Sequence, residues 1–286
     1  MIIVKLQGGL GNQMFQYAAA AGLNKGKICL DLSFLRKHNK STPTFTARKF
    51  ELAVFPNLKA NLVNRLVSKT LDSRKVIHRL IKKMLFPGLT TITDATENKQ
   101  AAGQRIGHKT IYLDGYFQNE NNFKHIRQEL LKRFEFPVLK GPALTWSKKI
   151  QIDDNSVSIH VRRSDYLKPH VNNFHGVLPL SYYQKAKSII AGKIKAPQYY
   201  IFSDDPEWCA ANFSFPDNPA LIIKNTSNAW EDMCLMSQCK HHIIANSSYS
   251  WWAAWLNQNE NKIVIAPDKW FVQEPADIVP ETWIKI

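Results

Sequence analysis

Short apolar runs alternate with amphipathic stretches along the chain, and this pattern predicts strands and helices in turn. The runs that we expect to form strands span residues 2–6, 27–30, 111–113, 157–161, 199–202, 221–223, 242–245 and 263–266. We expect no strand after residue 266. Helical spacing is found over residues 12–21, 62–85, 120–134, 181–191, 228–239 and 251–256, and around Trp208. Strands that alternate with helices favour a parallel sheet covered by helices, so the sequence predicts an α/β protein.

The predicted helix over residues 62–85 is amphipathic and strongly basic. Its apolar positions are Val76, Ile77, Leu80, Ile81 and Met84. The remaining positions hold one acid, Asp72, against the basic residues Arg65, Lys69, Arg74, Lys75, Arg79, Lys82 and Lys83. Such a helix can lie on an anionic membrane, or it can pack on its own domain with the basic face in water. The second arrangement is the more common one, so membrane contact is the alternative here.

A segment with two prolines and a glycine, 137–142, separates two halves of the chain. A chain of 286 residues is long enough for two modest domains. We therefore expect an N-terminal domain over residues 1–145 and a C-terminal domain over residues 146–286. Residues 168–178 are expected to form a loop.

The net charge of +15 favours acidic partners, which include nucleic acid, anionic membrane and phosphorylated small molecules. The first residues lack the basic region typical of a signal peptide, and no apolar run is long enough to span a bilayer. We expect a cytoplasmic protein, free or attached to the inner face of the cell membrane. Cys234 and Cys239 lie close to His241 and His242, but their spacing matches no common zinc pattern, so no metal site is expected.

Residues 8–13, Gly-Gly-Leu-Gly-Asn-Gln, lie between the first predicted strand and the first predicted helix. Asn12 is a favourable N-cap residue, so the helix is expected to begin near it. A glycine-rich turn before a helix can present backbone N–H groups to an anion, and a tight turn without a ligand explains the pattern equally well. The dinucleotide fingerprint is excluded because its third glycine is missing.

The central predicted strand runs into His160-Val161-Arg162-Arg163-Ser164-Asp165-Tyr166. Adjacent guanidinium groups at a strand end can form fork-like hydrogen bonds to phosphate oxygens. Ligands of open α/β sheets bind at the carboxyl ends of the strands, so the position fits as well. The structural alternative is a solvated strand end whose arginines pair with carboxylates.

Two later strand ends carry polar clusters, Ser203-Asp204-Asp205 and Asn246-Ser247-Ser248-Tyr249-Ser250-Trp251-Trp252. With the arginine motif, the glycine-rich turn and Gly115-Tyr116-Phe117-Gln118, this set resembles glycosyltransferase family 11, the α-1,2-fucosyltransferases. The resemblance extends from residue 1 to about residue 270. The His-x-Arg-Arg-x-Asp element also occurs in α-1,6- and protein O-fucosyltransferases.

This resemblance implies a GT-B fold, in which two Rossmann-like domains face a cleft. The C-terminal domain would bind GDP-fucose, and the N-terminal domain would lie on the acceptor side. The implied reaction is inverting transfer of L-fucose to the 2-hydroxyl of a terminal β-galactoside in an oligosaccharide or surface glycan, which could be lipid-linked. No cofactor or divalent metal is implied. The pairs Asp153-Asp154 and Asp204-Asp205 also lack the Asp-x-Asp spacing of metal-dependent sugar transferases.

The resemblance also implies roles for single residues. Arg162 would bind the β-phosphate with support from Arg163, and His160 would lie beside the diphosphate or fucose. Asp165 would orient the arginines or act on the acceptor hydroxyl. The further donor-binding candidates are Gly11, Asn12, Ser203, Asp204, Asp232, Ser247, Ser248 and Tyr249.

Some of these roles have open alternatives. Asp232 would read the guanine edge, but a surface charge on a helix explains it as well. Ser203 and Asp204 fit a structural turn equally well. The catalytic base could be Asp165 or His160, and the phosphate of GDP could take the proton instead.

Two rival functions follow from the same residues. One is a fucosyltransferase that forms another linkage, such as α-1,6. The other is a basic nucleic-acid-binding protein, suggested by the charge and by eight tryptophans. The basic stretch over residues 62–85 lacks interleaved aromatics and no nucleic-acid-binding motif is present, so we expect no nucleic-acid partner.

Overall fold

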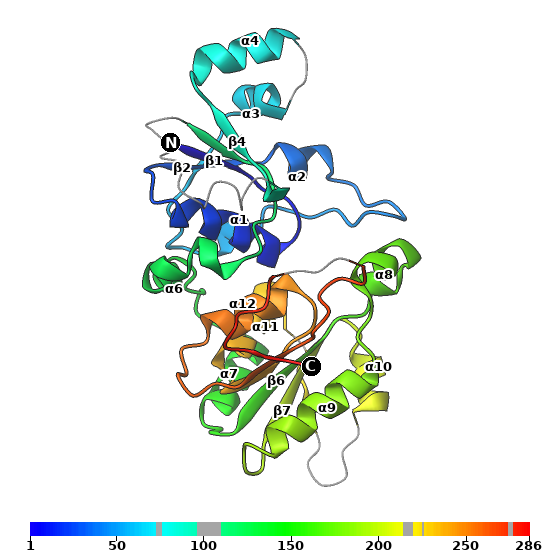
Figure 1. Cartoon of the computed structure of the whole chain (residues 1–286). Helices are drawn as coiled ribbons and strands as arrows, with labels where there is room; N and C mark the ends of the chain where they lie inside the picture. The colour runs from blue at the N-terminus through cyan, green and yellow to red at the C-terminus, as the bar shows by residue number, and fades with distance from the viewer. Residues whose placement is uncertain (73–75, 96–109, 214–219, 225, 274–276) are drawn as a thin grey trace. The chain divides into compact units, whose positions relative to one another are not determined.

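The structure, a computed structural model, describes residues 1–72, 76–95, 110–213, 220–224, 226–273 and 277–286. The chain divides into two compact units, Met1–Glu135 and Phe136–Ile286. Each unit contains its own parallel sheet with covering helices (Figure 1). The predicted α/β class with two Rossmann-like domains is therefore confirmed.

The division between the units falls ten residues before the expected boundary at residue 145. The difference concerns helix α7 (Gly141–Gln151), which packs on the C-terminal unit. Within this helix, Ser147 Oγ donates to Gln238 Oε1 at 2.7 Å, and Trp146 Nε1 donates to the carbonyl oxygen of Lys224 at 3.4 Å. These contacts assign α7, which begins at Gly141 inside the Pro- and Gly-containing segment, to the second unit.

The N-terminal sheet has the strand order β3-β2-β1-β5-β4, and all its strands are parallel. Its strands are β1 (Ile2–Lys5), β2 (Ile28–Asp31), β3 (Asn61–Leu62), β4 (Thr90–Ile92) and β5 (Ile111–Leu113). The order reverses between β1 and β5, so the loops after these two strands lie at the switch point of this sheet. Strands β3 and β4 were not predicted because each contains a single apolar residue and so forms no apolar run.

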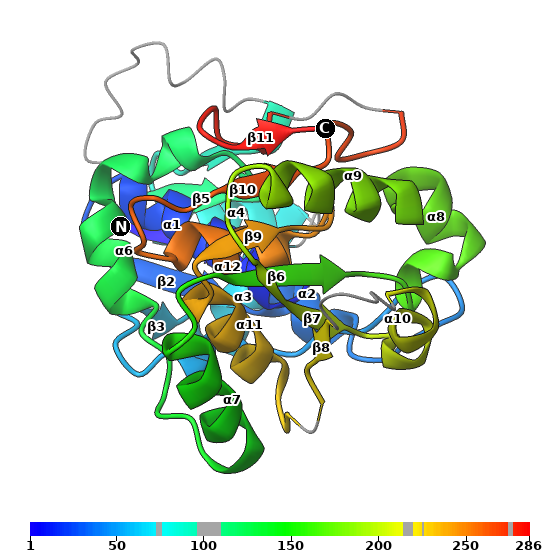
Figure 2. The same ribbon diagram turned by 90° about the horizontal axis from the view of Figure 1, so that it is seen from below.

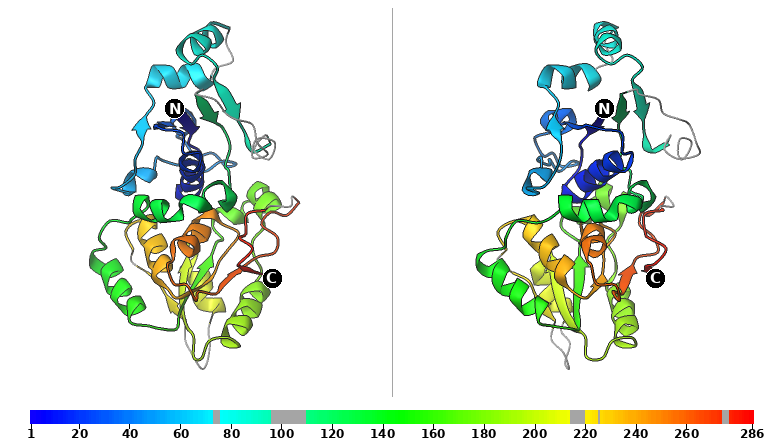
Figure 3. Two further views of the ribbon diagram at one scale, coloured as in Figure 1. Left: turned by 60° about the vertical axis from the view of Figure 1, so that its left-hand side comes forward. Right: turned by 90° about the vertical axis from the view of Figure 1, so that its left-hand side faces the viewer.

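Helix α1 (Leu10–Gly22) packs between this sheet and the segment that contains α6 (Figures 1 and 3). Gly22 permits the close approach, because a Cβ there would lie 1.9 Å from the carbonyl oxygen of Asn122. The single helix predicted over residues 120–134 was wrong in part. The segment forms two 3-10 turns, η2 (Glu120–Asn122) and η3 (Lys124–Ile126), before α6 (Arg127–Arg133).

The basic stretch over residues 62–85 forms two helices, α3 (Arg65–Asp72) and α4 (Val76–Leu85), rather than one. Arg74 and Lys75 lie outside the described residues. Helix α3 packs on α2 (Ser33–Lys37) and on α4. Leu71 of α3 contributes with Val63 to a cluster on Ile3 and Tyr112, so α3 covers the face of the sheet to which these side chains point.

Helix α4 contrasts with α3 because its apolar residues are largely exposed. Leu80 is 60% exposed and Met84 is 74% exposed. A one-turn 3-10 helix, η1 (Leu52–Val54), completes this unit. In the part of the chain that the structure describes, no helix is long and apolar enough to cross a membrane.

The C-terminal sheet has the strand order β11-β10-β9-β6-β7-β8 and is also fully parallel. Its strands are β6 (Ser156–Val161), β7 (Gln198–Ser203), β8 (Leu221–Ile222), β9 (His241–Ile243), β10 (Val264–Ala266) and β11 (Ile284–Lys285). The order corresponds to that of the Rossmann fold, with the switch point between β6 and β9. Strand β11 adds an edge beyond the strand that we expected to be the last.

Helices cover both faces of the C-terminal sheet. Helix α9 (Leu180–Ala191) lies on one face, and α7, α11 (Ala229–Gln238) and α12 (Ser248–Leu256) lie together on the other (Figures 1 and 2). The connection after β6, expected to be a loop over residues 168–178, contains the short helix α8 (Pro169–His175). Pro169 at its first position and Gly176 after its last explain where it begins and ends.

The alternation of apolar and polar residues along β6 separates its two faces. Val157, Ile159 and Val161 belong to the core beneath α9. Ser158 and His160 point to the opposite face and are also buried. There, the hydroxyl of Ser158 and Nδ1 of His242 lie 2.8 Å apart in a hydrogen bond. A buried polar face therefore leads along the central strand to its carboxyl end.

Candidate functional site

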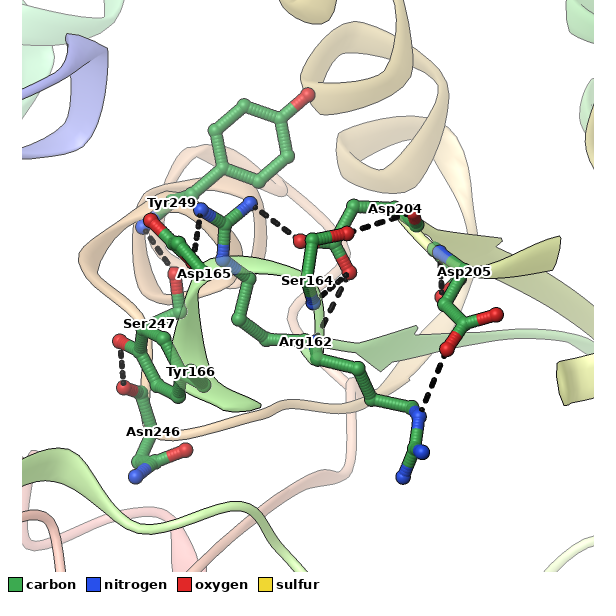
Figure 4. A network of polar contacts seen from close by, with 11 residues as sticks. Arg162, Ser164, Asp165, Tyr166, Asp204, Asp205, Asn246, Ser247 and Tyr249 are labelled. Carbon is green, nitrogen blue, oxygen red and sulfur yellow. Dashed lines mark hydrogen bonds and ion pairs between the residues drawn. The ribbon is translucent and has the colours of Figure 1, made fainter. Parts of the chain in front are cut away.

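The C-terminal unit brings together the polar residues that follow β6, β7 and β9. These strands are neighbours in a parallel sheet, so their carboxyl ends lie at the same edge. Arg162, after β6, binds Asp204, after β7. Tyr166 donates from its hydroxyl to the carbonyl oxygen of Asn246, after β9, at 3.0 Å. Figure 4 shows these residues around the end of β6, at the switch point where open α/β sheets bind ligands.

Arg162 is held by two carboxylates. Its Nη2 lies 2.6 Å from Asp165 Oδ1, and its Nη1 lies 2.8 Å from Asp204 Oδ2. Burial disfavours the charged guanidinium, but Asp204 and Asp165 outweigh this effect and raise the pKa of Arg162. The side chain is 23% exposed, and two ion pairs leave other N–H groups of its five for a ligand. Arg162 is thus a fixed cation that a ligand can reach.

Arg163 has different surroundings. Its Nε donates to Asp205 Oδ2 at 3.0 Å, and its guanidinium carbon lies 3.9 Å from the centroid of the Trp208 ring. Both partners belong to the start of α10 (Pro206–Asn212), where Asp205 is the N-cap. Arg163 therefore joins the loop after β6 to α10, which agrees with a supporting role more than with direct phosphate binding.

Asp204 organises the loop that carries both arginines. Its Oδ1 accepts from the backbone N–H groups of Arg163 at 2.9 Å and Ser164 at 3.3 Å. Its carbonyl oxygen accepts from Ser164 Oγ at 2.8 Å. Ser203 Oγ accepts from the N–H of Asp205 at 2.9 Å and shapes the turn after β7. These contacts give Ser203 and Asp204 a structural role, and direct nucleotide contact by either stays a prediction.

His160 is buried at the end of β6, 5.5 Å from the ring of Tyr249 between centroids. Burial, with a smaller contribution from the charge of Arg162, lowers the pKa of His160 to about 3. Its Nδ1 has no hydrogen-bond partner among the described residues. A base with so low a pKa takes up a proton poorly at neutral pH. The geometry therefore favours a neutral His160 that shapes the site over a catalytic base.

A second histidine lies in the electrostatic neighbourhood of Asp165. His175, at the end of α8, stacks on Tyr166 with 4.8 Å between ring centroids. Burial lowers the pKa of His175, the charge of Asp165 opposes this shift, and that of Arg162 adds to it. These interactions show that α8 brings His175 into the electrostatic neighbourhood of the Arg162–Asp165 pair. The sequence missed this helix because seven residues leave no clear periodicity.

The loop after β9 leads into the N-terminus of α12. Ser247 is the N-cap, and its Oγ accepts from the N–H of Tyr249 at 3.4 Å. Ser247, Ser248 and Tyr249 are half-buried, and the Tyr249 hydroxyl donates to the carbonyl oxygen of Ala229. Because β9 is parallel to β6, the positive end of this helix lies at the same sheet edge as Arg162.

Asn246 is structural in this arrangement. Its side chain is buried, and its Nδ2 donates to the carbonyl oxygens of His175 at 2.6 Å, Gly176 at 3.1 Å and Trp270 at 3.3 Å. One amide therefore ties the end of β9 to α8 and to the segment before β11.

Asp232 lies in the first turn of α11, and most of its side chain is covered. Burial raises its pKa to about 6, a hydrogen bond from Thr226 opposes the shift, and the charge of Glu231 adds to it. Its Oδ1 is buried without a hydrogen-bond partner among the described residues. An orphaned buried carboxylate oxygen is costly, so this atom is suited to accept from a ligand.

Gly11 and Asn12 lie inside α1 of the N-terminal unit. The helix begins at Leu10 with Gly9 as its N-cap, so the expected cap at Asn12 was wrong. Gly8 forms the turn with φ of +75°, and Asn12 Oδ1 accepts from Gln118 Nε2 at 2.8 Å. Gly11 is buried and carries no side chain, which leaves it only its backbone for a ligand.

Two buried glutamines hold this turn, and only the first of them lies in the glycine-rich motif over residues 8–13. Gln13 Nε2 donates to the carbonyl oxygens of Gly8 at 2.9 Å and Lys49 at 2.7 Å. Gln16 accepts from the N–H of Gln7 at 3.0 Å and donates to the carbonyl oxygen of Gly115 at 3.1 Å. The loops after β1 and β5 are therefore joined through α1.

Residues with metal-binding side chains do not gather in the described parts of either unit, where no group of three or more His, Cys, Asp or Glu could hold a metal ion. The four cysteines are free, and all but the half-buried Cys29 are buried.

Comparison with known proteins gives matches along the whole chain. The model of glycosyl transferase family 11 matches residues 1–286. The O-antigen biosynthesis glycosyltransferase WbnK of Escherichia coli is 34% identical, over 98% of this chain and 99% of its own length. An α-1,2-colitosyltransferase of Escherichia coli is 31% identical, over 100% of this chain and 99% of its own length.

Solved structures give weaker matches. The α-1,6-fucosyltransferase NodZ, soaked with GDP-fucose, has a TM-score of 0.48 and 14% identity, over 89% of this chain and 92% of that chain.

Proposed function

Because the chain belongs to glycosyl transferase family 11 and is a glycosyltransferase, we propose that it transfers L-fucose from GDP-fucose to the 2-hydroxyl of a terminal β-galactoside. The transfer inverts the anomeric centre and requires no divalent metal. The observation that carries the proposal is Arg162, a half-buried cation held by two carboxylates at the switch point of a Rossmann-type sheet. The acceptor is a glycan of a surface polysaccharide, as the O-antigen relative suggests.

Charge at the switch point supports a diphosphate leaving group. Breaking the bond between fucose and GDP leaves negative charge on the β-phosphate. A preorganised guanidinium and the positive end of a helix stabilise such charge without reorganisation. Arg162 and the N-terminus of α12 lie at one sheet edge and supply both. Arg163 and Asp204 keep Arg162 in place.

Asp232 is the candidate for guanine recognition in the same unit. A guanine edge offers N1–H and an amino group side by side, and a carboxylate can accept from both. The orphaned Oδ1 of Asp232 and the raised pKa of this carboxyl indicate an oxygen that lacks a donor. Binding of guanine would provide that donor and favour the ionised form.

Proton removal from the acceptor hydroxyl falls to Asp165 or to the phosphate of GDP. Asp165 is 19% exposed, and its Oδ1 binds Arg162. Its other oxygen is placed on the same rigid turn and can accept a proton or orient the hydroxyl. His160 is the weaker candidate because burial lowers its pKa to about 3.

Two other transfers compete with this proposal. Transfer of colitose is favoured by the α-1,2-colitosyltransferase that is 31% identical. Colitose lacks the 3-hydroxyl of fucose, and a site that hydrogen-bonds a hydroxyl rejects an analogue without it by about 10⁴-fold or more. Donor selectivity therefore separates these two sugars, and linkage analysis of the product separates α-1,2 from α-1,6 transfer.

The test is isothermal titration of the purified protein with GDP-fucose, GDP-colitose, GDP-mannose and UDP-galactose in EDTA. We expect binding of the GDP-sugars alone, with GDP-fucose the tightest. Incubation with GDP-fucose and galactosides should then yield an α-1,2 linkage by NMR. Binding that requires a divalent metal, or a preference for UDP-galactose, would refute the proposed donor site.

We also propose that α4 attaches the protein peripherally to the cytoplasmic face of an anionic membrane. Four of its apolar side chains are at least 59% exposed: Val76, Ile77, Leu80 and Met84. Lys82 and Lys83 lie in its last turn. An apolar face flanked by lysines can enter the headgroup region while the lysines bind anionic lipids.

Co-sedimentation with vesicles tests this attachment. We expect binding to vesicles that contain phosphatidylglycerol and little binding to phosphatidylcholine alone. The double variant Leu80→Ser/Met84→Ser should lose binding. The matched control is Val138→Ser/Ile152→Ser, which removes side chains that are 82% and 84% exposed in the other unit. Equal binding by both variants would refute a role for α4.

A further inference from the structure

A cavity of about 1020 Å³ is lined by residues of the N-terminal unit alone. It is lined by α2, by the segment 47–50 and by α3. Its cationic lining residues are Arg36, Lys37, Arg48, Lys49, Arg65 and Lys69. Among the described residues that line it, none is an Asp or a Glu. The cavity therefore presents basic groups from three separate segments.

Two carboxylates interact with lining residues and offset part of this charge. Asp31 is fully buried, and it accepts from Ser33 Oγ at 3.0 Å, from Ser68 Oγ and from the hydroxyl of Tyr112 at 2.9 Å. The charge of Glu51 interacts with Arg48. Four lining cations form no ion pair with a carboxylate of the described residues: Arg36, Lys49, Arg65 and Lys69.

The arrangement of these cations brings like charges together. Arg65 and Lys69 are four residues apart on α3, so they share one face, where like charges repel. Arg36 and Lys37 lie in the last turn of α2, which packs on α3. A bound dianion would convert this repulsion into attraction. Arginine forks match phosphate oxygens in geometry as well as in charge.

We propose that this cavity binds a phosphate or diphosphate ester carried by the acceptor. The inference rests on the proposed function, in which the donor's diphosphate binds the C-terminal unit. An anion site formed wholly by the N-terminal unit would then bind the acceptor. The cavity is large enough for a diphosphate with part of an attached sugar.

The position of α3 agrees with a lipid-linked form of this acceptor. This helix carries Arg65 and Lys69 of the cavity, and it packs on α4, whose apolar face is exposed. An acceptor in which a diphosphate joins the glycan to a membrane lipid would place its anionic group beside the helix that we expect to contact the membrane.

The first experiment measures binding of inorganic pyrophosphate by isothermal titration. The variant Lys49→Gln/Lys69→Gln should bind it about tenfold more weakly than the unchanged protein. The control Lys124→Gln/Lys148→Gln removes the same charge at exposed positions outside the cavity and should bind normally. Pyrophosphate can also bind at the donor site, so Arg162→Ala should remove only the part of the binding that does not depend on Lys49 and Lys69. Equal weakening by the control, or complete loss of binding with Arg162→Ala alone, would overturn the cavity as the site.

The second experiment compares two acceptors with the same galactoside, one free and one esterified to a diphosphate. The diphosphate ester should have a KM about tenfold lower, and Lys49→Gln/Lys69→Gln should remove this advantage while the KM of the free galactoside is unchanged. Equal KM values would overturn the assignment to the acceptor. A cavity variant that loses only binding to phosphatidylglycerol vesicles would indicate a lipid headgroup instead, and would also overturn it.

Failure of this inference can be told apart from failure of the proposed function. Pyrophosphate binding is measured without GDP-fucose and without any transfer. Absence of fucosyl transfer together with binding that depends on Lys49 and Lys69 would refute the function and keep the anion site. Transfer without such binding would support the function and refute the anion site.

Discussion

Asp204 binds both the guanidinium group of Arg162 and the backbone of the loop that carries it. Its Oδ2 accepts from Arg162 Nη1 at 2.8 Å, and its Oδ1 accepts from the N–H of Arg163 at 2.9 Å. One carboxylate from β7 thus sets the position of the cation that follows β6. Displacement of a binding group by about 1 Å can cost about 10²-fold in rate, so this relationship bears on catalysis.

Replacement of Asp204 should therefore impair transfer through the position of Arg162. We expect Asp204→Asn to lower kcat/KM for GDP-fucose by about 10- to 100-fold, because the neutral amide holds Arg162 less firmly. Steady-state kinetics with the donor varied measures the change. Asp154→Asn is the control, since that side chain is 94% exposed. Equal activities of the two variants would contradict the positioning role.

The two arginines should respond differently to the same substitution. Arg162→Lys keeps the charge but loses the planar fork, and we expect kcat/KM to fall by about 100-fold or more. Arg162→Ala should abolish turnover. Arg163→Lys should cost about tenfold or less in kcat/KM, because Arg163 contacts Asp205 and Trp208 instead. Its main effect should be a lower thermal midpoint. A greater catalytic loss for Arg163→Lys would reverse the assignment of the two residues.

Asp165→Asn should lower turnover sharply. This substitution removes the charge that neutralises Arg162, and it removes a candidate base. If Asp165 is the base, kcat should fall while the dissociation constant of GDP-fucose changes little. If Asp165 only orients Arg162, kcat should fall and the dissociation constant of GDP-fucose should rise. Single-turnover kinetics and titration separate these results. Normal turnover of the purified variant would remove Asp165 from the candidate bases.

Donor binding should depend on pH through Asp232. Burial raises the pKa of this carboxyl to about 6, so it is ionised above this pH and protonated below it. A protonated carboxyl accepts poorly from guanine, and the affinity for GDP-fucose should fall about tenfold between pH 7.5 and pH 5. The diphosphate of GDP-fucose does not titrate in this range, so the protein is the source of the effect.

The variant Asp232→Asn provides the check on this pH dependence. It should bind GDP-fucose weakly at pH 7.5 and show little further change on acidification. Asp154→Asn should keep the dependence of the unchanged protein. An unaltered pH profile in Asp232→Asn would assign the titration to another group, and His175 would then be the first to examine.

Much of this architecture could be predicted from periodicity. The run of Val157, Ile159 and Val161 marks β6 as a buried strand, and similar runs mark most other strands of four residues or more. Motif order along the chain was also enough for the family, because strand ends and the residues after them are local in sequence. Strands β3 and β11, which each contain a single apolar residue, and the seven-residue α8 show no such run or period.

The sequence by itself determined which residue types follow each strand, and hence the family and its chemistry. Only the tertiary structure decided what each side chain does there. It separated Arg162 from Arg163, assigned Asp204 to the support of Arg162, and made His160 a poor base by burial. It also joined α2 and α3 around a basic cavity. Such roles depend on distances between residues far apart in the chain and on exclusion of water, and neither quantity is written in a local pattern of residues.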